Sequence, residues 1–236
     1  MTTHFDFPRE MVYGKKHLNK LSNDDLNHCK FVQLVEQLFG CELNMLHLVK
    51  ENEYSLFTEI GKDTDTEFHR KFYEKLNSNW DEIYAEYDSL IKNVVLPYLG
   101  LTEALVQRFP TFRVKLPDNV ASSTKHYDSD PLHKHPTGEV NFIYALTDMY
   151  DSNSLNVEKM PRLEQYETLD LKAGECISFN GNKCTHFNEI NQTGKTRLSL
   201  DFRILPFNYF DASYEVCSAT KQSKFDETGY YRRISL

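Results

Sequence analysis

The spacing of apolar residues changes near position 110. Before it, apolar residues recur every three or four positions, a period typical of helices. We expect one helix from a capping pair at Ser22 and Asp25 to Gly40. A longer apolar stripe predicts a second helix, from a capping pattern at 64–67 to the Pro97–Gly100 region. The first hundred residues are therefore predicted to be mainly helical.

From residue 111 onward the apolar residues alternate with polar ones, which predicts β-strands separated by Gly-, Asn- and Pro-containing turns. The expected strands are 111–116, 123–128, 139–147, 154–158, 166–171, 176–179, 184–191 and 196–205. About eight short antiparallel strands after helices are typical of a jelly-roll, that is, a cupin-like double-stranded β-helix. The predicted fold class is mainly β with a helical annex. Such a barrel has an open mouth where residues from separate strands converge.

Three parts of one structural domain follow from these patterns. Residues 1–108 form a helical part packed on the barrel, 109–206 form the double-stranded β-helix core, and 207–236 form a C-terminal tail or lid. The last segment is polar with interspersed aromatic residues, and it either covers the barrel mouth or pads the outside. Its cluster Tyr230–Arg233 is interpreted first as a flexible basic tail and second as a substrate lid.

Composition and net charge limit the partners and the cellular compartment that we expect for the protein. The 236 residues carry a net charge of −8, which offers no basic field for nucleic acid or an anionic membrane. No apolar run approaches a membrane-spanning length, and the N-terminus lacks a signal pattern. Five cysteines without Cys-x-x-Cys spacing favour a reduced, cytoplasmic setting. Cys184 is interpreted as buried filler, with soft metal ligation as the alternative.

The candidate chemistry lies in His126, Asp128 and His186. His126 and Asp128 are two positions apart, so on an extended strand both side chains leave the same face. His186 follows 58 residues after Asp128 and must be brought there by the fold. Two imidazoles and one carboxylate on one side of a metal are the pattern of non-haem Fe(II) oxygenases, although affinity alone also allows zinc or manganese.

A second candidate element follows His186. The segment KTRLSLDFRIL alternates, which places Arg197 and Ser199 on one face of a strand and Leu198 and Leu200 on the other. A guanidinium binds a carboxylate through two parallel hydrogen bonds, and a neighbouring hydroxyl adds a third. Taken alone, His126 is better explained as a histidine in a surface turn, and Arg197 as a solvated charge on a strand. Their joint order favours a functional site.

Weaker candidates surround this set. Asn141 either binds a cosubstrate or substrate oxygen or is a satisfied polar residue between sheets. Arg113, with Lys115, either binds an anionic substrate or faces water on an edge strand; solvation is preferred. For His133 and His135 we favour a loop at the pocket mouth or the surface over metal ligation. For Asp201 and Arg203 we favour an ion-pair network below the site. Glu139 and Glu158 are further substrate-binding candidates.

The segments KHYDSDPLHKHPTGEVNFIYALTD and AGECISFNGNKCTHFNEINQTGKTRLSLDFRILP carry a resemblance to a known family. With FRVKLPDN and SNSLNVE, they resemble the StrG-type proteins of streptomycin biosynthesis. They are also similar to related oxygenases of sporadic carbohydrate clusters, within the Fe(II)/2-oxoglutarate-dependent oxygenase superfamily. The likeness covers under half of the chain, with its motifs in the same order.

The resemblance implies iron on His126, Asp128 and His186, and 2-oxoglutarate on Arg197 and Ser199. It also points to the pocket strand with Glu139 and Asn141. It implies an enzyme that uses Fe(II), 2-oxoglutarate and O2 to hydroxylate or desaturate a small polar metabolite, such as a sugar, amino sugar or nucleotide sugar. Because Asp128 supplies the carboxylate that halogenases lack, it implies no halogenation.

Two alternatives to this function stay open at this stage. One is an amino-acid hydroxylase with the same chemistry. The other is a non-catalytic cupin-like binding module, which would be expected to have lost a ligand. Beyond the small-molecule substrate, the partner expected of the chain is a second copy in a homodimer.

Overall fold

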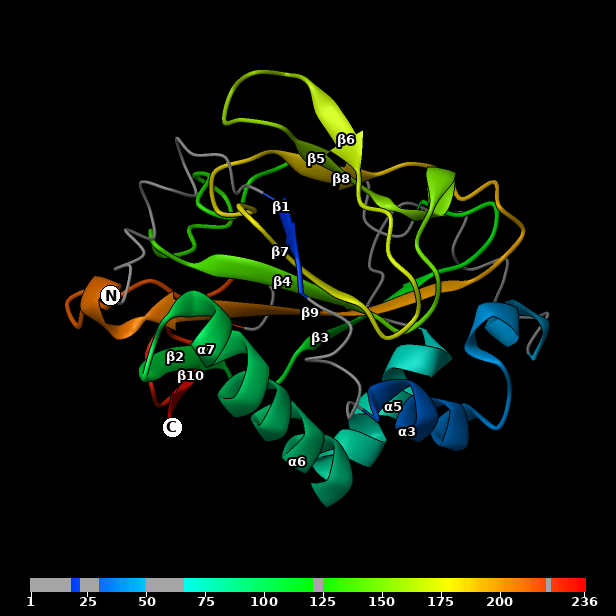
Figure 1. Ribbon diagram of the computed structural model, residues 1–236, viewed down its shortest axis with the longest axis horizontal. Helices are drawn as coiled ribbons and strands as arrows, with labels where there is room; N and C mark the ends of the chain where they lie inside the picture. Colours follow the sequence, from blue (N-terminus) through cyan, green and yellow to red (C-terminus); the bar gives the residue numbers. More distant parts are fainter. Residues whose placement is uncertain (1–17, 22–29, 50–65, 121–124, 220–221) are drawn as a thin grey trace.

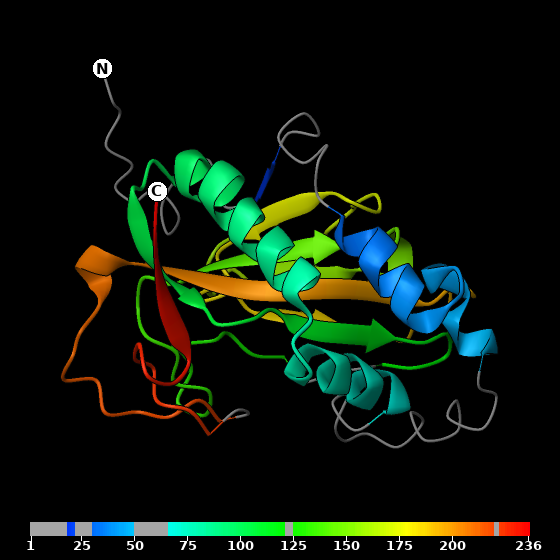
Figure 2. The ribbon, with the colours of Figure 1, turned by 90° about the horizontal axis from the view of Figure 1, so that it is seen from below.

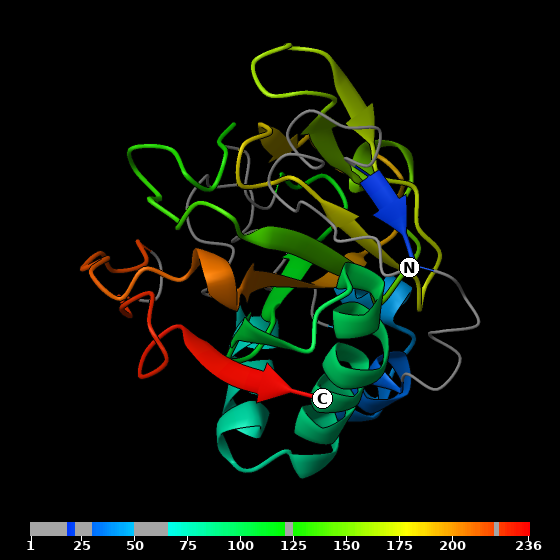
Figure 3. The ribbon, with the colours of Figure 1, turned by 60° about the vertical axis from the view of Figure 1, so that its left-hand side comes forward.

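The computed structural model describes residues 18–21, 30–49, 66–120, 125–219 and 222–236. Two antiparallel sheets face each other, and helices cover the outer face of the larger sheet (Figure 1, Figure 3). The large sheet has the order β1 (Leu18–Lys20), β7 (Cys176–Phe179), β4 (Val140–Ala145), β9 (Arg197–Pro206), β2 (Glu103–Gln107), β10 (Tyr231–Ser235), with β3 (Thr111–Lys115) also paired to β9. The small sheet has the order β6 (Tyr166–Thr168), β5 (Leu155–Glu158), β8 (His186–Asn188).

The chain passes repeatedly between the two sheets. After β3 in the large sheet, His126 forms a bridge to β8 in the small sheet, and β4 returns to the large one. Strands β5 and β6 are again in the small sheet, β7 in the large, β8 in the small and β9 in the large. This alternation is that of a double-stranded β-helix, as the sequence predicted.

Helices cover the outer face of the large sheet (Figure 2). They are α3 (Phe31–Phe39), the 3-10 helix η1 (Leu43–Leu48), α5 (Glu67–Asn77), α6 (Asp81–Leu90), the π-helix η3 (Ile91–Val95) and α7 (Leu96–Leu99). Their apolar residues form one core with the outward residues of the sheet, in which the Phe72 and Phe112 rings stack with centroids 4.2 Å apart. A smaller core, which includes Ile143, Val157 and Phe179, fills the space between the sheets. Two further short 3-10 helices, η4 (Asp151–Asn153) and η5 (Phe207–Tyr209), lie in the connections.

The single long helix predicted from residue 64 to about 100 is wrong. Helix α5 ends at Asn77, and Asn79 has a left-handed backbone (φ 64°) before α6 begins at Asp81. The apolar stripe continues across this break because both helices pack on the same core. Helix α6 then continues without a gap through the π-helix η3 into α7, which contains Pro97 and ends at Gly100.

The first helix ends at Gly40 (φ 71°) as predicted, but it begins only at Phe31. The capping pair expected at 22 and 25 lies outside the described residues, as does the start of the strand expected at 123–128. The other predicted strands are present, with shorter bounds in several cases. Strands β1, β2 and β10 are short and are not among the predicted strands.

The interpretation of the C-terminus as a flexible basic tail is wrong. Residues Tyr231–Ser235 form β10, which pairs with β2 at the edge of the large sheet. Arg232 and Arg233 make ion pairs with Asp88 and Glu103. Strand β10 is therefore part of the sheet. Its two arginine side chains pair with carboxylates on α6 and β2. Among the described residues, no helix has the length and apolarity that crossing a membrane requires.

Candidate metal centre and carboxylate clamp

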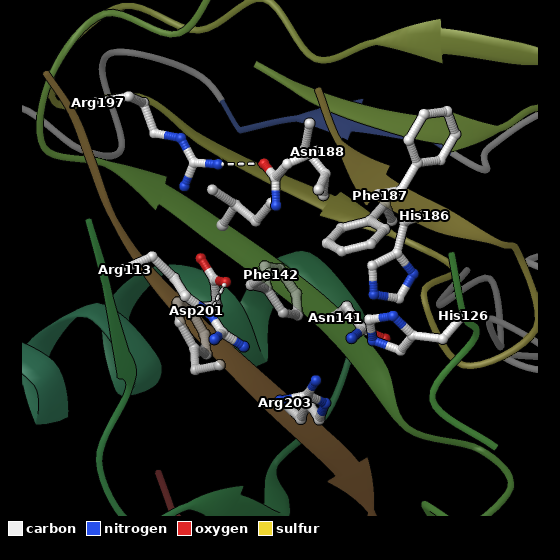
Figure 4. Close-up of a pocket in the computed structure, with 14 residues that line it drawn as sticks. Arg113, His126, Asn141, Phe142, His186, Phe187, Asn188, Arg197, Asp201 and Arg203 are labelled. Carbon is white, nitrogen blue, oxygen red and sulfur yellow. Dashed lines mark hydrogen bonds and ion pairs between the residues drawn. The ribbon is translucent and has the colours of Figure 1, made fainter. Parts of the chain in front are cut away.

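The structure brings the three predicted ligands together. Asp128 Oδ1 lies 3.8 Å from His126 Nε2 and 3.8 Å from His186 Nε2. The two imidazole centroids are 4.5 Å apart, and one ligand atom from each residue lies within 4.8 Å of the others. Figure 4 shows both imidazoles side by side at one end of the pocket, near Asn141. The 58-residue gap is closed by the pairing of the His126 segment with β8.

Backbone contacts fix this convergence. His126 and His186 exchange two backbone hydrogen bonds, of 3.3 and 2.8 Å, and the Asp128 amide donates to the Gly181 carbonyl at 2.9 Å. A Cβ at Gly181 would lie 2.7 Å from Cγ of Asn141. Only glycine lets the backbone that anchors Asp128 approach Asn141 so closely.

His186 is prepared to donate a lone pair. Its Nδ1 lies 3.1 Å from the Cys184 carbonyl, to which a protonated Nδ1 donates, leaving Nε2 as the acceptor that faces Asp128. Burial lowers the pKa of His186, although Asp128 opposes this shift. The imidazole is thus neutral near pH 7, the form that binds metal ions.

Asp128 presents one carboxylate oxygen to the imidazoles. Its other oxygen, Oδ2, accepts hydrogen bonds from Asn141 Nδ2 at 2.6 Å and from Arg203 Nε at 2.7 Å. Burial alone would raise the pKa of Asp128, but Arg203, with His135 and His186, holds it well below its usual range. The carboxylate is therefore ionised, with Oδ1 directed at the histidines.

Arg197 lines the pocket and is buried, and Ser199 lies beside it on the same face of β9, as the alternation predicted. Arg197 donates from Nη1 to Ser199 Oγ at 3.0 Å, from Nη2 to Asn188 Oδ1 at 2.7 Å and from Nε to the Asn153 carbonyl at 3.1 Å. These bonds hold the guanidinium across the pocket from the histidines (Figure 4). A buried, pre-oriented guanidinium is suited to bind a carboxylate.

One pocket connects the two ends. Its lining residues are Arg113, His126, Asn141, Phe142, Ile143, Leu155, Phe179, His186, Phe187, Asn188, Arg197, Asp201, Phe202 and Arg203. Asn141 Nδ2 donates to Asp128, whereas its buried Oδ1 has no hydrogen-bond partner among the described residues. Arg113 lines the middle of the pocket and forms an ion pair of 3.1 Å with Asp201. Arg203 forms a second ion pair, with Asp128. The ion pairs expected of Asp201 and Arg203 are thus present, but both residues line the pocket and do not lie below the site.

Glu139 and Glu158, two of the substrate candidates, do not line this pocket. The Glu139 carboxylate contacts the Tyr231 hydroxyl and His135 Nδ1, on the far side of Asp128. The Glu158 carboxylate accepts backbone N–H groups of Glu164 and Thr185 at 2.8 and 2.9 Å, which stabilises the β5–β6 connection. Both carboxylates are occupied by the fold, because buried carboxylates need donors.

The remaining candidates differ in where they lie. His133 packs its ring on His126, with centroids 4.3 Å apart, and its Nδ1 bonds Asp130. The preferred surface interpretation is wrong for His135, which is buried, and the solvated interpretation is wrong for Lys115, which is fully buried. Cys184 is buried filler between the sheets, where burial raises its thiol pKa to about 12.

Asn188 is a pocket residue that was not predicted from the sequence, and Asp201 and Arg203 lie closer to the site than predicted. Asp201 and Arg203 continue the Arg197 and Ser199 alternation, which was the signal that could have placed all four residues on the pocket side. Asn188 is two positions after His186 on β8, and the same period-two rule places its side chain on the same face.

A jelly-roll with two imidazoles and a carboxylate at one end of a pocket, and a buried arginine at the other, has the features of the non-haem Fe(II)/2-oxoglutarate-dependent oxygenase superfamily. The chain belongs to the StrG family. It is 35% identical over 151 residues to the streptomycin biosynthesis protein StrG of Streptomyces griseus, a match that covers 63% of this chain and 67% of that protein. No protein-family model matches the chain.

The solved structures that match the chain are distant from it in sequence. The non-haem monooxygenase ThoJ, in a nickel complex, is 13% identical with a TM-score of 0.47, covering 98% of this chain and 84% of that one. SnoK, a non-haem alpha-ketoglutarate-dependent carbocyclase from nogalamycin biosynthesis, is 12% identical with a TM-score of 0.46, covering 86% and 83%. A 2-oxoglutarate–Fe(II) oxygenase family protein of Burkholderia pseudomallei is 10% identical with a TM-score of 0.46, covering 85% and 88%.

Proposed function

We propose that this protein is a non-haem Fe(II)/2-oxoglutarate-dependent oxygenase that hydroxylates or desaturates a small polar metabolite. The observation that supports it most is the pair of 3.8 Å distances from Asp128 Oδ1 to the two imidazole Nε2 atoms. A metal held by these three atoms would keep positions open for other ligands, and the donor set suits Fe(II).

In this proposal His126, Asp128 and His186 hold the iron, and Arg197 with Ser199 binds the distal carboxylate of 2-oxoglutarate. When bound, iron and 2-oxoglutarate use O2 to oxidise a substrate C–H bond and release succinate and CO2. The chain would thus hold 2-oxoglutarate between the metal at one end of the pocket and Arg197 at the other. Asn141 lines the same pocket, and within the described part of the chain its buried Oδ1 has no partner, which favours a hydrogen-bond donor from the bound ligands beside the metal.

The substrate class rests on the family. A relative named for streptomycin biosynthesis favours a sugar, amino sugar or nucleotide sugar. The ion pair of Arg113 with Asp201 in the pocket wall offers both charges to a polar molecule of this kind. An amino-acid substrate of the same chemistry is the second candidate, favoured by the same pair. The net charge of −8 supports the absence of a nucleic-acid partner. The five cysteines without Cys-x-x-Cys spacing support a cytoplasmic setting, and a homodimer is the proposed assembly.

The test is aerobic incubation with Fe(II), ascorbate and labelled 2-oxoglutarate, comparing wild type with Asp128→Ala. The control is Asp170→Ala, which removes an exposed carboxylate outside the pocket. Wild type and the control are expected to release succinate slowly, and faster with the matching member of a panel of sugars, nucleotide sugars and amino acids. Asp128→Ala should release none. Equal release by all three proteins would contradict the proposal.

Metal binding separates this enzyme from a non-catalytic module. Under anaerobic conditions we expect one Fe(II) per chain and, with 2-oxoglutarate, the weak visible band of an iron–ketoacid chelate. His126→Ala and His186→Ala should abolish the band. A protein that shows the band but never exceeds the succinate release of Asp128→Ala with any of these compounds would favour the binding module.

A further inference from the structure

Several polar side chains lie close together on the side of Asp128 that faces away from the two histidines. Asp128, His135 and Glu139 are all buried and have ligand atoms within 4.8 Å of one another, a grouping that could by itself hold a second cation. A cation is already there. The Arg203 guanidinium lies with Nε 2.7 Å from Asp128 Oδ2 and 4.0 Å from Glu139 Oε2. The cluster is therefore a fixed charge network and not a second metal site.

Arg203 is held by residues far away in the chain. Its Nη1 donates to the Tyr230 hydroxyl at 3.2 Å and lies 3.4 Å from Gln107 Oε1, while Tyr230 itself donates to that Gln107 oxygen at 2.9 Å. Gln107 ends β2, and Tyr230 directly precedes β10. The pairing of these two strands therefore sets where the guanidinium sits.

The same C-terminal strand supports the rest of the network. The Tyr231 hydroxyl donates to Glu139, whose other oxygen bonds His135 Nδ1 at 2.7 Å. The His135 ring packs on Phe225 and Tyr230, with centroids 4.7 and 5.5 Å away. All of these polar groups are buried, so each depends on its partner, and removal of one would leave others unsatisfied.

The hydrogen bonds of Asp128 determine how many of its oxygens can bind a metal. A carboxylate can bind a metal through one oxygen or through both. Asp128 Oδ2 already accepts two short hydrogen bonds, from Asn141 and Arg203, which are directly opposite each other on β4 and β9. Only Oδ1 remains for the metal. One-oxygen binding keeps an additional coordination position available for the cosubstrate or O2.

We propose that Arg203 is a positioning residue that, together with Asn141, restricts Asp128 to one-oxygen metal binding, and that the C-terminal strand completes the metal centre by fixing Arg203 through Tyr230. This inference rests on the proposed function. It makes strand β10 part of the site, although none of its residues is among the three proposed ligands.

The experiment is anaerobic titration of the whole protein with Co(II), whose visible absorption reports coordination, followed by addition of 2-oxoglutarate. Partners of metal ligands typically contribute about 10–100-fold to metal affinity. Arg203→Met is expected to weaken Co(II) binding by about that factor and to change the spectrum of the bound metal. Arg203→Lys should recover part of the affinity. The control Arg232→Met removes an arginine of β10 that pairs with Asp88 outside the network.

Tyr230→Phe removes one hydroxyl and keeps the ring, so it carries the test if Arg203→Met does not fold. It should weaken Co(II) binding about fivefold, as expected for one hydrogen bond, and shift the spectrum in the same direction. Wild-type affinity and spectrum in Arg203→Met, or in Tyr230→Phe where the former is insoluble, would overturn the inference. If Asp128→Ala also binds Co(II) like wild type, the proposed metal site itself fails. Loss in Asp128→Ala alone refutes only the role of Arg203.

Discussion

The two faces of β9 show how one strand serves two purposes. Its outward residues are Leu198, Leu200, Phe202 and Ile204, and its pocket-side residues are Arg197, Ser199, Asp201 and Arg203. The outward set packs against the helices in the main apolar core. The inward set forms hydrogen bonds and ion pairs with named partners around the pocket. Strand β3 repeats the contrast, with Phe112 and Val114 outward and Arg113 and Lys115 inward.

The difference separates stability from ligand binding. Apolar burial outward stabilises the fold without specifying any ligand. Inward, buried charges gain little net stability, because pairing mainly offsets the loss of hydration, but they are held in fixed orientations. Substitutions on the outward face should therefore lower the free energy of unfolding, whereas substitutions on the inward face should mainly weaken ligand binding.

The largest effect on the outward face is expected for Leu200→Ala. Leu200 is fully buried, and loss of such a side chain typically costs about 2–5 kcal/mol. The free energy of unfolding, measured by chemical denaturation, should fall by that amount, while the dissociation constant for 2-oxoglutarate in the folded protein stays unchanged. Leu132→Ala, at a side chain that is 70% exposed, is the control. A loss of stability no larger than in this control would contradict the comparison.

The inward counterpart is Arg197→Ala. Removing one partner of a buried charge pair with the cosubstrate carboxylate costs about 2–5 kcal/mol of binding free energy. Calorimetric titration with 2-oxoglutarate should show a rise in dissociation constant of about thirtyfold or more, with Fe(II) binding largely retained. An unchanged affinity for 2-oxoglutarate would remove Arg197 from the site.

Lys115 allows a measurement of how much a buried charge on the inward face lowers the free energy of unfolding. It lies opposite Arg197 in the β3–β9 register, and its Nζ donates to the carbonyls of Ser152 and Ser154 at 2.7 and 3.2 Å. Burial, with the nearby Arg197 charge, lowers the pKa of Lys115 to about 6, against a smaller opposite effect of Glu189. The unfolded chain keeps this proton up to about pH 10. Protonation therefore favours unfolding between these two values, and stability should rise with pH across them.

The measurement is the free energy of unfolding of wild type and Lys115→Met at several pH values from 6.5 to 9.5. The difference, wild type minus variant, should increase by about 1 kcal/mol per pH unit, the maximum for one proton being close to this. Parallel pH profiles would mean that Lys115 stays charged inside the fold.

The smallest effect is expected for Ser199→Ala. Its hydroxyl accepts from Arg197 and donates to Asp201 Oδ1 at 2.8 Å, so it orients the clamp without carrying charge. Loss of about 1 kcal/mol should raise the dissociation constant for 2-oxoglutarate about fivefold. Ser178→Ala, at a buried serine that bonds Tyr98 outside the pocket, is the matched control and should leave this constant unchanged. Equal effects of the two substitutions would place Ser199 outside the clamp.

Much of the fold and site could be predicted from periodicity. The period-two segments predicted the barrel strands, because alternation directly reports which face of a strand is buried. The same rule put His126 with Asp128, and Arg197 with Ser199, on shared faces. It failed for the helix break at Asn79, because two helices that pack on one core keep a single apolar stripe.

The sequence by itself determined the residue types that converge and the faces they occupy, since both follow from local geometry. Only the tertiary structure decided which of them meet. The pairing of β10 with β2 makes the C-terminus part of a network behind Asp128, and Glu139 faces that network instead of the pocket. Such contacts join residues far apart in the sequence, as Tyr230 and Gln107 are, 123 positions from each other. Local pattern carries no information on these pairings, because they depend on how separate strands assemble.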